Sequence, residues 1–499
     1  MTQLLGIDIG TSACKITVFS EDGVPLVTSN QPYNVYYPHP GYVEQSPNEW
    51  WTAICSGIKE VLSSDKVDSS QIAGIGVDGQ SWSCIPVDRL GNVLFNTPIW
   101  MDTRAADICT RYKNLIGEDK IFDVAGNDFL PSYTTPKIIW FKENYPEIYR
   151  NTSFFLQSNS YIVYKLTGKF SQDLSQGYGI HFFNMSTLTY DESLADEFGI
   201  DSNLLPELYQ CDQIVGKVTN EAAILTGLIA GTPVVAGGLD AACGSLGAGV
   251  YKKGQTQEQG GQAGGMSICT DKALSHKKLI LSPHVVPGYW LLQGGTVGGS
   301  GSLRWFKEQF GKDLTFDDLT REASTIAPGS DGMIFLPYMA GERSPIWDPN
   351  AKGVFYGLSF DKSRAHMIRA VLEGTAFSLY HNLMVAKEVG ANVEIMRSMG
   401  GASNSELWTQ IKSDVTGCTI EVPAMDTATT LGAAILAGIG TKVYSSYEEA
   451  VKKTTEVLRV HTPTVENHKK YMHSMNLYLE LSKTLSPVFS AEFCSGYPG

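Results

Sequence analysis

One short segment constrains the fold more than any other part of this chain. An apolar run at residues 234–236 leads through two glycines to Asp240, and a run of small residues follows. This order is typical of a strand that ends at an aspartate where a helix begins. Because a carboxylate in that position can take a proton from a substrate hydroxyl, Asp240 is our candidate for a catalytic base.

A second segment of this kind opens the chain. Residues 4–7 form an apolar run that ends at Asp8, and the turn Gly10, Thr11 and Ser12 follows. Such a turn can direct N–H groups and hydroxyls at a phosphate, while Asp8 can hold Mg²⁺ through water. An ordinary hairpin turn is an equal alternative for this segment. With Asp240 far away in sequence, the pair indicates a cleft between two halves.

Length, charge and cysteine content exclude several classes of protein. A chain of 499 residues exceeds what one core usually organises, which favours two domains. A net charge of −14, without runs of Lys or Arg, disfavours nucleic acid. No export signal and no bilayer-length apolar run is found, so no membrane partner is expected. Nine scattered cysteines indicate reduced thiols in a cytoplasmic protein.

Hydrophobic periodicity predicts the main elements of both halves. The expected strands lie at residues 4–30 (a hairpin pair), 72–77, 83–87 and 290–293. The expected helices lie at residues 46–62, 303–310, 365–380 and 405–415. Each half places strands before helices, as an α/β domain does, and duplication of one domain is left open.

Two glycine-rich segments are candidates for nucleotide binding, since the Walker pattern is absent. Residues 74–79 match the dinucleotide fingerprint, but a strand containing Pro86 follows where the fingerprint needs a helix, so we set the match aside. Gly400 and Gly401 precede a helix and would let adenine or ribose approach the backbone, with Asn404 as a polar contact. Taken alone, a tight strand-to-helix connection outweighs that interpretation.

A third group combines aromatic and charged side chains and is a candidate for polyol binding. Trp82 and Trp100 could supply aromatic faces, and Asp102 and Arg104 could bind hydroxyls. The alternative is that both tryptophans belong to the core and that Asp102 caps a helix over residues 105–112.

Taken together, these segments resemble the FGGY family of carbohydrate kinases over nearly the whole chain. One family signature is matched by residues 132–144, and a second by residues 353–358 with residues 366–373. Residues 335–345 resemble the xylulose-kinase branch. The resemblance implies an α/β fold with two actin-like (ribonuclease H-like) domains flanking a catalytic cleft. It places sugar binding and the base in residues 1–245, and mainly ATP binding in residues 246–499.

The resemblance also assigns roles to individual residues. It makes Asp240 the catalytic base and Asp8 the magnesium-associated acid. The implied sugar-binding residues are Gln80, Ser81, Trp82, Asp102, Arg104 and Asp240. The implied ATP-binding residues are Gly10, Thr11, Ser12, Lys15, Gly261, Gln262, Ser300, Gly301, Gly400, Gly401 and Asn404. ATP and Mg²⁺ are the implied cofactors, a small sugar the implied partner, and a homodimer the implied assembly.

Three departures from the family pattern keep other functions open. Ser81 and Trp82 replace the Met-His pair of xylulose kinases, and Ala241 replaces an asparagine. The expected activity, phosphorylation of D-xylulose, therefore competes with phosphorylation of ribulose, gluconate, glycerol or a quorum-signal sugar. Gln262 and Ala263 replace two hydroxyl residues of the second phosphate loop, which motivates a non-catalytic sugar- or nucleotide-binding protein. An actin-like or chaperone-like ATPase is disfavoured because the signatures cover both halves.

Overall fold

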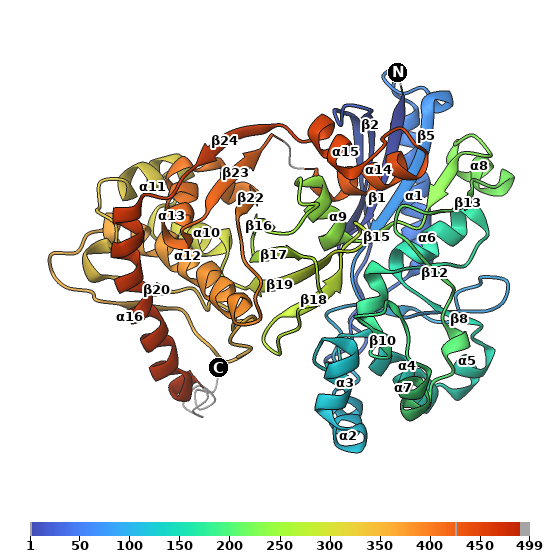
Figure 1. Ribbon diagram of the computed structural model, residues 1–499, viewed down its shortest axis with the longest axis horizontal. Helices are drawn as coiled ribbons and strands as arrows, with labels where there is room; N and C mark the ends of the chain where they lie inside the picture. Colours follow the sequence, from blue (N-terminus) through green and yellow to red (C-terminus); the bar gives the residue numbers. More distant parts are fainter. Residues whose placement is uncertain (1, 425–426, 490–499) are drawn as a thin grey trace.

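The computed structural model describes residues 2–424 and 427–489, which form two α/β lobes side by side (Figure 1). In these two ranges every cysteine is a free thiol, and no helix is long and apolar enough to cross a membrane. Cys494 lies outside the described residues. Each lobe is built on its own seven-stranded sheet, as the sequence predicts for two α/β domains.

The first sheet has β1 at its centre. This strand runs antiparallel to β2 and parallel to β5, so the hairpin predicted at the start of the chain is confirmed. The strand order is β13-β14-β5-β1-β2-β3, and β15 also pairs with β5. Its members are β1 (Gln3–Ile9), β2 (Ala13–Ser20), β3 (Pro25–Pro32), β5 (Ile72–Gly79), β13 (Ile214–Lys217), β14 (Pro233–Val235) and β15 (Gly238–Leu239).

The second sheet repeats this plan around β16. β16 is antiparallel to β17 and parallel to β22, and the order is β18-β19-β17-β16-β22-β23-β24. In both lobes an antiparallel run of strands continues into two parallel pairs, so one topology occurs twice, with β18 as an additional antiparallel strand at the edge of the second sheet. The strands are β16 (Gln255–Gly260), β17 (Gly264–Thr270), β18 (Ile280–Pro283), β19 (Trp290–Thr296), β22 (Ile395–Met399), β23 (Thr419–Pro423) and β24 (Val457–His461).

Helices flank both sheets (Figure 1). Short strands in the segments between the main elements form two-stranded sheets. The helices of the first part of the chain are α1 (Pro47–Leu62), α2 (Ala106–Ile116), α3 (Glu118–Ala125), α4 (Thr134–Asn144), α5 (Pro146–Asn151), α6 (Ser158–Thr167), α7 (Glu192–Phe198), α8 (Asn220–Thr226) and α9 (Asp240–Gly247). Those of the second part are α10 (Ser300–Phe310), α11 (Phe316–Ala323), α12 (Arg364–Glu388), α13 (Glu406–Thr416), α14 (Ala428–Gly440), α15 (Tyr447–Thr454) and α16 (Val465–Phe489). The short strands are β4 (Glu44–Gln45), β6 (Ile85–Val87), β7 (Thr97–Pro98), β8 (Phe154–Leu156), β9 (Gln172–Asp173), β10 (Phe183–Asn184), β11 (Thr189–Tyr190), β12 (Leu208–Tyr209), β20 (Ile334–Leu336) and β21 (Val354–Tyr356).

The predicted helices at residues 46–62, 303–310, 365–380 and 405–415 are all present, and α12 continues beyond its predicted end. Ser405 caps α13 by accepting a hydrogen bond from the N–H of Trp408. The alternative that Asp102 caps a helix is wrong, because α2 begins at Ala106 and Ala105 is its N-cap.

Helix α14 comes late in the chain but packs against the first sheet, beside α9 (Figure 1). The approach is so close that a Cβ on Gly6 would overlap the carbonyl oxygen of Thr430, and one on Gly76 that of Ala433. Glycine at these positions leaves room for the helix backbone. Helix α14 therefore completes the first lobe and ties the two lobes together, whereas α16 packs on the second lobe.

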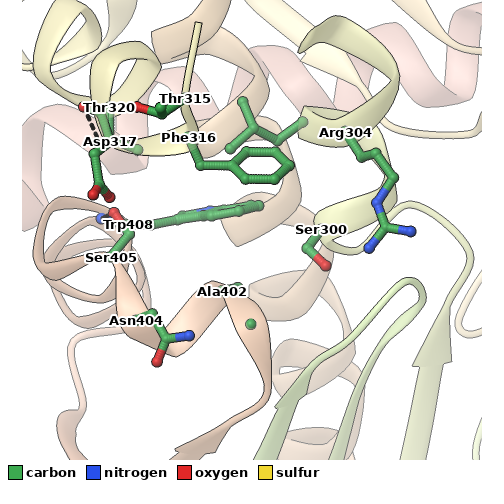
Figure 2. A pocket seen from close by; sticks show the side chains of 12 residues that line it. Ser300, Arg304, Thr315, Phe316, Asp317, Thr320, Ala402, Asn404, Ser405 and Trp408 are labelled. Carbon is green, nitrogen blue, oxygen red and sulfur yellow. Dashed lines mark hydrogen bonds between the residues drawn. The ribbon is translucent and has the colours of Figure 1, made fainter. Parts of the chain in front are cut away.

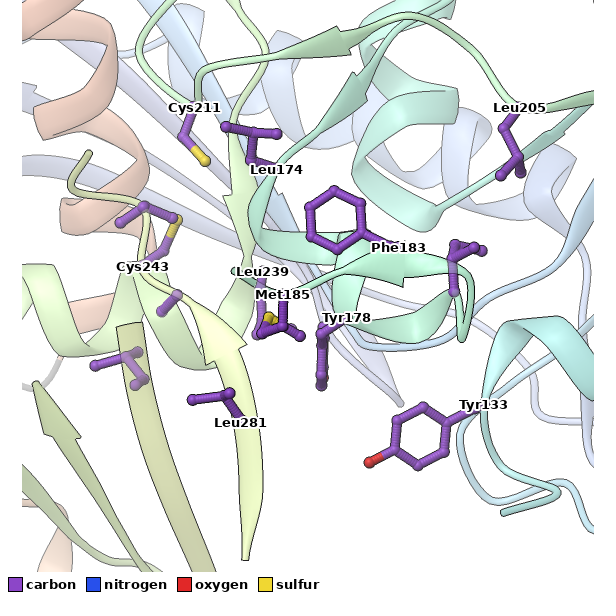
Figure 3. Close-up of a cluster of buried hydrophobic side chains, with 14 of the residues drawn as sticks. Tyr133, Leu174, Tyr178, Phe183, Met185, Leu205, Cys211, Leu239, Cys243 and Leu281 are labelled. Atoms are coloured by element: carbon purple, nitrogen blue, oxygen red, sulfur yellow. The ribbon is translucent and has the colours of Figure 1, made fainter. Parts of the chain in front are cut away.

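A buried cluster beneath the cleft also joins the lobes. Figure 3 shows Leu281 of β18 in the same cluster as Tyr178 and Leu239 of the first lobe. Asn127 fixes this contact, because its side chain donates to the carbonyl of Leu281 at 2.8 Å and accepts from the N–H of Leu281 at 2.9 Å. The cluster places Tyr133 and Tyr178, with Trp82 packed against them, at the boundary between the two lobes.

Candidate active site

Asp240 lies where the sequence predicts it, at the junction of β15 and α9. It is the first residue of α9, and its Oδ1 accepts a hydrogen bond of 2.6 Å from the N–H of Ala241. Burial raises the pKa of Asp240 to about 7, and the negative charge of Asp8 adds to the rise. A carboxylate with such a pKa is suited to take up a proton near neutral pH.

Asp8 and Asp78 lie side by side at the ends of two parallel strands. They are register partners in β1 and β5, and Thr429 of α14 donates a 3.0 Å hydrogen bond to Oδ2 of Asp8. Burial raises the pKa of both carboxyls, and the neighbouring charges of Asp8 and Asp240 raise that of Asp78 further. The sequence analysis did not single out Asp78, because only the pairing of β1 with β5 brings it beside Asp8.

A cavity of about 350 Å³ lies between the two lobes at Asp240. Lys15 and Asp240 line it from the first lobe, and Gly261 and Gly400 line it from the second. The structure therefore brings together the predicted base, Lys15 of the predicted ATP-binding set, the second phosphate loop and the adenosine segment, whereas Gly10, Thr11 and Ser12 do not line this cavity. Gln257, Gln259 and Met399 also line the cavity and had not been singled out.

The first phosphate turn is tied to the first lobe by two side chains. Trp100 donates from its indole N–H to Oγ1 of Thr11 at 3.0 Å, and Gln45 donates to the carbonyl of Thr11 at 2.7 Å. Gln45 in turn accepts a 2.6 Å hydrogen bond from Gln80. The turn and the loop after β5 therefore form one hydrogen-bonded unit.

The second phosphate loop is held against the start of α10. The N–H and hydroxyl of Ser300 both donate to the carbonyl of Gly261, at 2.9 and 2.6 Å, and the N–H of Gly301 donates to that of Gln262 at 3.0 Å. The side-chain amide of Gln262 lies against Gly301, where a Cβ would overlap it. These contacts fix the loop although the usual hydroxyl side chains are missing.

A second pocket, of about 450 Å³, opens next to this loop in the second lobe. The sequence-predicted Ser300, Gly401 and Asn404 line it, which brings together segments of α10 and α13. Figure 2 shows the rings of Phe316 and Trp408 on opposite sides of the pocket. A flat aromatic group of nucleobase size fits between such rings.

Most of the side chains that line this pocket lie outside the predicted set, among them Phe316, Trp408 and Arg304. Trp408 lies within the helix predicted at residues 405–415, and Phe316 is the first residue of α11. Arg304 also lines the pocket, and Figure 2 shows it beside Ser300. Only tertiary packing brings α10, α11 and α13 together, so no local pattern could have found this set.

The loop after β5 packs into a group of three aromatic rings, called here the aromatic surface, in which Trp82 is partly exposed and Tyr133 and Tyr178 are buried. The indole of Trp82 stacks on Tyr133 with ring centroids 4.1 Å apart. The ring centroid of Tyr178 lies 5.4 Å from that of Trp82. Tyr178 also donates a 2.6 Å hydrogen bond to Oγ of Ser81. Burial raises the pKa of Tyr178, and the negative charge of Asp240 adds to the rise.

Three of the predicted sugar-binding side chains are buried behind this surface. Asp102 and Arg104 form an ion pair of 2.8 Å in which both side chains are 0% exposed, and Arg104 also contacts Glu44 at 2.7 Å. Arg104 further stacks over Tyr42 at 4.1 Å. Gln80 is 1% exposed and donates to Gln45. The contacts of these three side chains are with protein groups of the first lobe.

Family models match both halves of the chain. The model of the N-terminal domain of the FGGY family of carbohydrate kinases covers residues 3–247, and that of the C-terminal domain covers residues 266–441. This chain belongs to the FGGY family of carbohydrate kinases. The resemblance found in the sequence motifs is confirmed, and with it the assignment as an enzyme that phosphorylates a carbohydrate.

Individual FGGY proteins match over nearly the full length. The chain is 32% identical to a xylulose kinase of Staphylococcus epidermidis, over 96% of each chain. It is 28% identical to a gluconokinase of Bacillus licheniformis, over 97% of this chain and 96% of the relative. The structure of a xylulose kinase from Rhodospirillum rubrum, 26% identical, superposes with a TM-score of 0.91 and covers 98% of this chain and 100% of that one. The predicted pair of actin-like α/β domains is thus confirmed.

Proposed function

We propose that this FGGY kinase transfers the γ-phosphoryl group of ATP to a primary hydroxyl of a small ketose, and that its substrate is D-xylulose, converted to D-xylulose 5-phosphate. The observation that carries the proposal is the cavity in which Asp240 faces the glycine loop of the opposite lobe. The xylulose kinases among the similar proteins support the choice of sugar.

In this reaction Asp240 is the general base. As the sugar hydroxyl oxygen attacks the γ-phosphorus, its proton passes to the carboxylate of Asp240, while the bond from phosphorus to the ADP oxygen breaks. The N–H groups around Gly10 and Gly261 face the phosphates and offset their charge. Closure of the lobes would exclude water, which is required because water competes with the sugar as acceptor.

ATP would lie mainly on the second lobe. We place its adenine between Phe316 and Trp408, its ribose near Gly401 and Asn404, and its phosphates along Gly261 and Gln262, where Ser300 and Gly301 hold the loop. Gly10, Thr11, Ser12 and Lys15 would meet the phosphates from the first lobe. The 450 Å³ pocket leads toward the Asp240 cavity because Ser300 and Gly401 in the pocket adjoin Gly261 and Gly400 in the cavity.

The residues present fit a magnesium ion bound together with ATP. Within the described ranges no group of three or more His, Cys, Asp or Glu side chains could hold a metal. Mg²⁺ needs no such cage, since it usually keeps several waters and binds through one or two carboxylates and substrate phosphates. Asp8 would supply the carboxylate, and the bound ion would offset the phosphate charge.

The sugar would lie between the aromatic surface and the base. We propose that Ser81, Trp82 and Asp240 contact it directly, while Gln80, Asp102 and Arg104 support the loops behind them.

We also propose a cytoplasmic location and a homodimer. Reduced thiols favour the location, and resemblance to the family favours the homodimer.

A kinase for gluconate is the second candidate. The gluconokinase similarity over nearly the whole chain favours it, as does the replacement of Met-His by Ser81 and Trp82. Both reactions would use the same base and the same ATP pocket. They differ only in which hydroxyl groups the aromatic surface accommodates.

The test is ADP release by the purified protein with ATP and Mg²⁺, across D-xylulose, D-ribulose, gluconate, glycerol and no sugar. We expect D-xylulose to give the highest kcat/KM. A higher value for gluconate would replace the substrate but keep the reaction. Sugar binding without ADP release would instead support a non-catalytic protein, and ADP release without sugar would contradict the kinase.

A further inference from the structure

Lys137 of α4 is fully buried, 0% exposed, and has no carboxylate as a hydrogen-bond partner. Its ammonium donates to three backbone carbonyls, those of Trp82 at 2.9 Å, Ile99 at 2.8 Å and Ser132 at 2.7 Å. Three donors with three acceptors satisfy the ammonium completely. A buried cation whose hydrogen bonds all go to carbonyls is unusual. Burial lowers the pKa of Lys137 to about 7, and the negative charge of Asp102 partly opposes that shift.

The three carbonyls belong to three separate segments of the proposed sugar side. Trp82 is in the loop after β5, Ile99 precedes Trp100 after β7, and Ser132 precedes Tyr133 at the start of α4. Trp100 holds Thr11 of the first phosphate turn, and Tyr133 stacks on Trp82. One ammonium therefore connects the three backbone segments that carry Trp82, Trp100 and Tyr133.

Trp82 needs such support because its backbone is strained. Its φ of 59° lies in the left-handed region, which is an outlier for a bulky side chain. Its indole N–H is buried and has no hydrogen-bond partner among the described residues. Strained backbone of this kind persists only where the surroundings enforce it, and it gathers at binding sites.

The start of α4 supplies the other restraints on the same loop. Thr134, one helical turn before Lys137, donates to the carbonyl of Ser83 at 3.3 Å. Tyr133 stacks on the indole, and Figure 3 shows Tyr133 and Tyr178 on the same side of the buried cluster. The helix therefore holds both the backbone and the ring of Trp82.

We propose that Lys137 is a positioning residue that fixes Trp82 as the platform for the sugar by binding the carbonyls of Trp82, Ile99 and Ser132 together. This rests on the proposed function, in which Trp82 contacts the sugar. Lys137 itself does not reach the cleft, so it acts through the three segments. Loss of the ammonium should loosen sugar binding and leave the ATP pocket of the other lobe unchanged.

The test compares Lys137→Met, which keeps the length but removes all three donors, with Lys137→Gln, which keeps two. We expect the sugar KM to rise roughly tenfold or more in Lys137→Met and less in Lys137→Gln, with the ATP KM within about twofold of wild type. Lys142→Met is the matched control, since this exposed lysine on the same helix binds the carbonyl of Gly199. Equal KM values in all variants, with only a lower Tm, would reduce Lys137 to a structural residue.

A double-mutant cycle with Trp82→Ala separates the proposed route from general loosening. If Lys137 acts through Trp82, adding Lys137→Met to Trp82→Ala changes the sugar KM little, whereas additive effects would contradict the proposal. Hydrogen exchange gives a readout that needs no turnover. In Lys137→Met, but not in Lys142→Met, we expect faster amide exchange in residues 81–84, 98–101 and 131–134 than in wild type. Unchanged exchange in these segments would overturn the inference. A wild-type protein that phosphorylates no sugar would refute the proposed function instead.

Discussion

Asp8 and Asp78 stand side by side at the ends of β1 and β5, whereas the corresponding strands of the second lobe, β16 and β22, carry Gln259 and Met399 there. Both strand pairs are parallel and central in sheets of the same order. One topology thus supplies carboxylates to the cleft from one side and neutral groups from the other. This division suits phosphoryl transfer, since the base belongs with the sugar and a second acidic wall would repel the phosphates.

The second lobe does contain a carboxylate close to these strand ends, but the carboxylate is neutralised. Glu258 of β16 forms a 2.6 Å ion pair with Lys412 of α13, and both side chains are buried. Ser398 of β22 also donates to Glu258. If ATP binds as proposed, its phosphates would meet backbone N–H groups and the Gln262 amide on this side of the cleft, with no free carboxylate of Glu258 to repel them.

The largest effect is expected when the proposed base is removed from the first lobe, which supplies the carboxylates of the cleft. Asp240→Asn should lower kcat by about 10²–10⁴-fold, because the amide cannot accept the hydroxyl proton, while the sugar KM and Tm stay near wild type. Coupled ADP assays and thermal melts measure both. Asp65→Asn, at an exposed position, serves as the control, and near wild-type turnover in Asp240→Asn would assign the base elsewhere.

The pH dependence of kcat/KM should show that a carboxyl of the first lobe governs the reaction. With the pKa of Asp240 raised to about 7, kcat/KM should fall roughly tenfold per pH unit below 7, and so roughly a hundredfold by pH 5. A group whose folded pKa is raised takes up its proton on folding, so its contribution to stability is lost as pH rises from about 4 to 7. A kcat/KM that stays level down to pH 5 would show that no such group governs the reaction.

Packing on the first sheet gives the next effect in size. Gly76→Ala would push a methyl group into the carbonyl of Ala433, and we expect it to lower the free energy of unfolding by about 1–3 kcal/mol. Gly74→Ala is the matched control on the same strand, because its Cβ would meet a methyl group of Thr441 first. Denaturant unfolding compares the two, and equal losses would mean that α14 does not press on β5 as described.

On the neutral side, the aromatic pocket should determine ATP affinity. Phe316→Ala removes one face of the pocket and should raise the ATP KM roughly fivefold to tenfold, since a stacked ring contributes about 1 kcal/mol. Phe310→Ala, at an exposed ring of α10, should leave it unchanged. A raised sugar KM with an unchanged ATP KM in Phe316→Ala would contradict the placement of adenine.

The smallest effect concerns the second phosphate loop. The double substitution Gln262→Thr with Ala263→Ser restores the hydroxyls of the family pattern and should lower the ATP KM by about twofold to tenfold. Ala263→Ser alone should give part of that gain. An unchanged ATP KM would show that the backbone and the Gln262 amide already satisfy the phosphates.

Local features of the sequence predicted much of the fold and the site. The strand, aspartate and helix at Asp240 are contiguous, so their pattern could be recognised without tertiary contacts. The same holds for the turn after Asp8 and for α1, whose apolar side chains recur at helical spacing. The family resemblance then assigned the second phosphate loop, which no local pattern would have identified.

Features formed by distant segments escaped the sequence analysis. Asp78 lies beside Asp8 only because β5 pairs with β1, and Phe316 faces Trp408 across the pocket only because α11 and α13 both pack against α12. Asp102 and Arg104, which the sequence predicts as sugar-binding residues, form a buried ion pair, and their role toward a sugar stays a prediction. Their charges could be read from the sequence, whereas their burial could not.

The contribution of α14 to the first lobe has a consequence for how the chain folds during synthesis. N-terminal domains generally fold first as they leave the ribosome. Here the face of β1 and β5 that carries Gly6 and Gly76 stays uncovered until residues 428–440 have been made. The first lobe can therefore finish folding only after most of the second lobe exists, and a protein truncated between the lobes would expose the sheet surface that α14 covers.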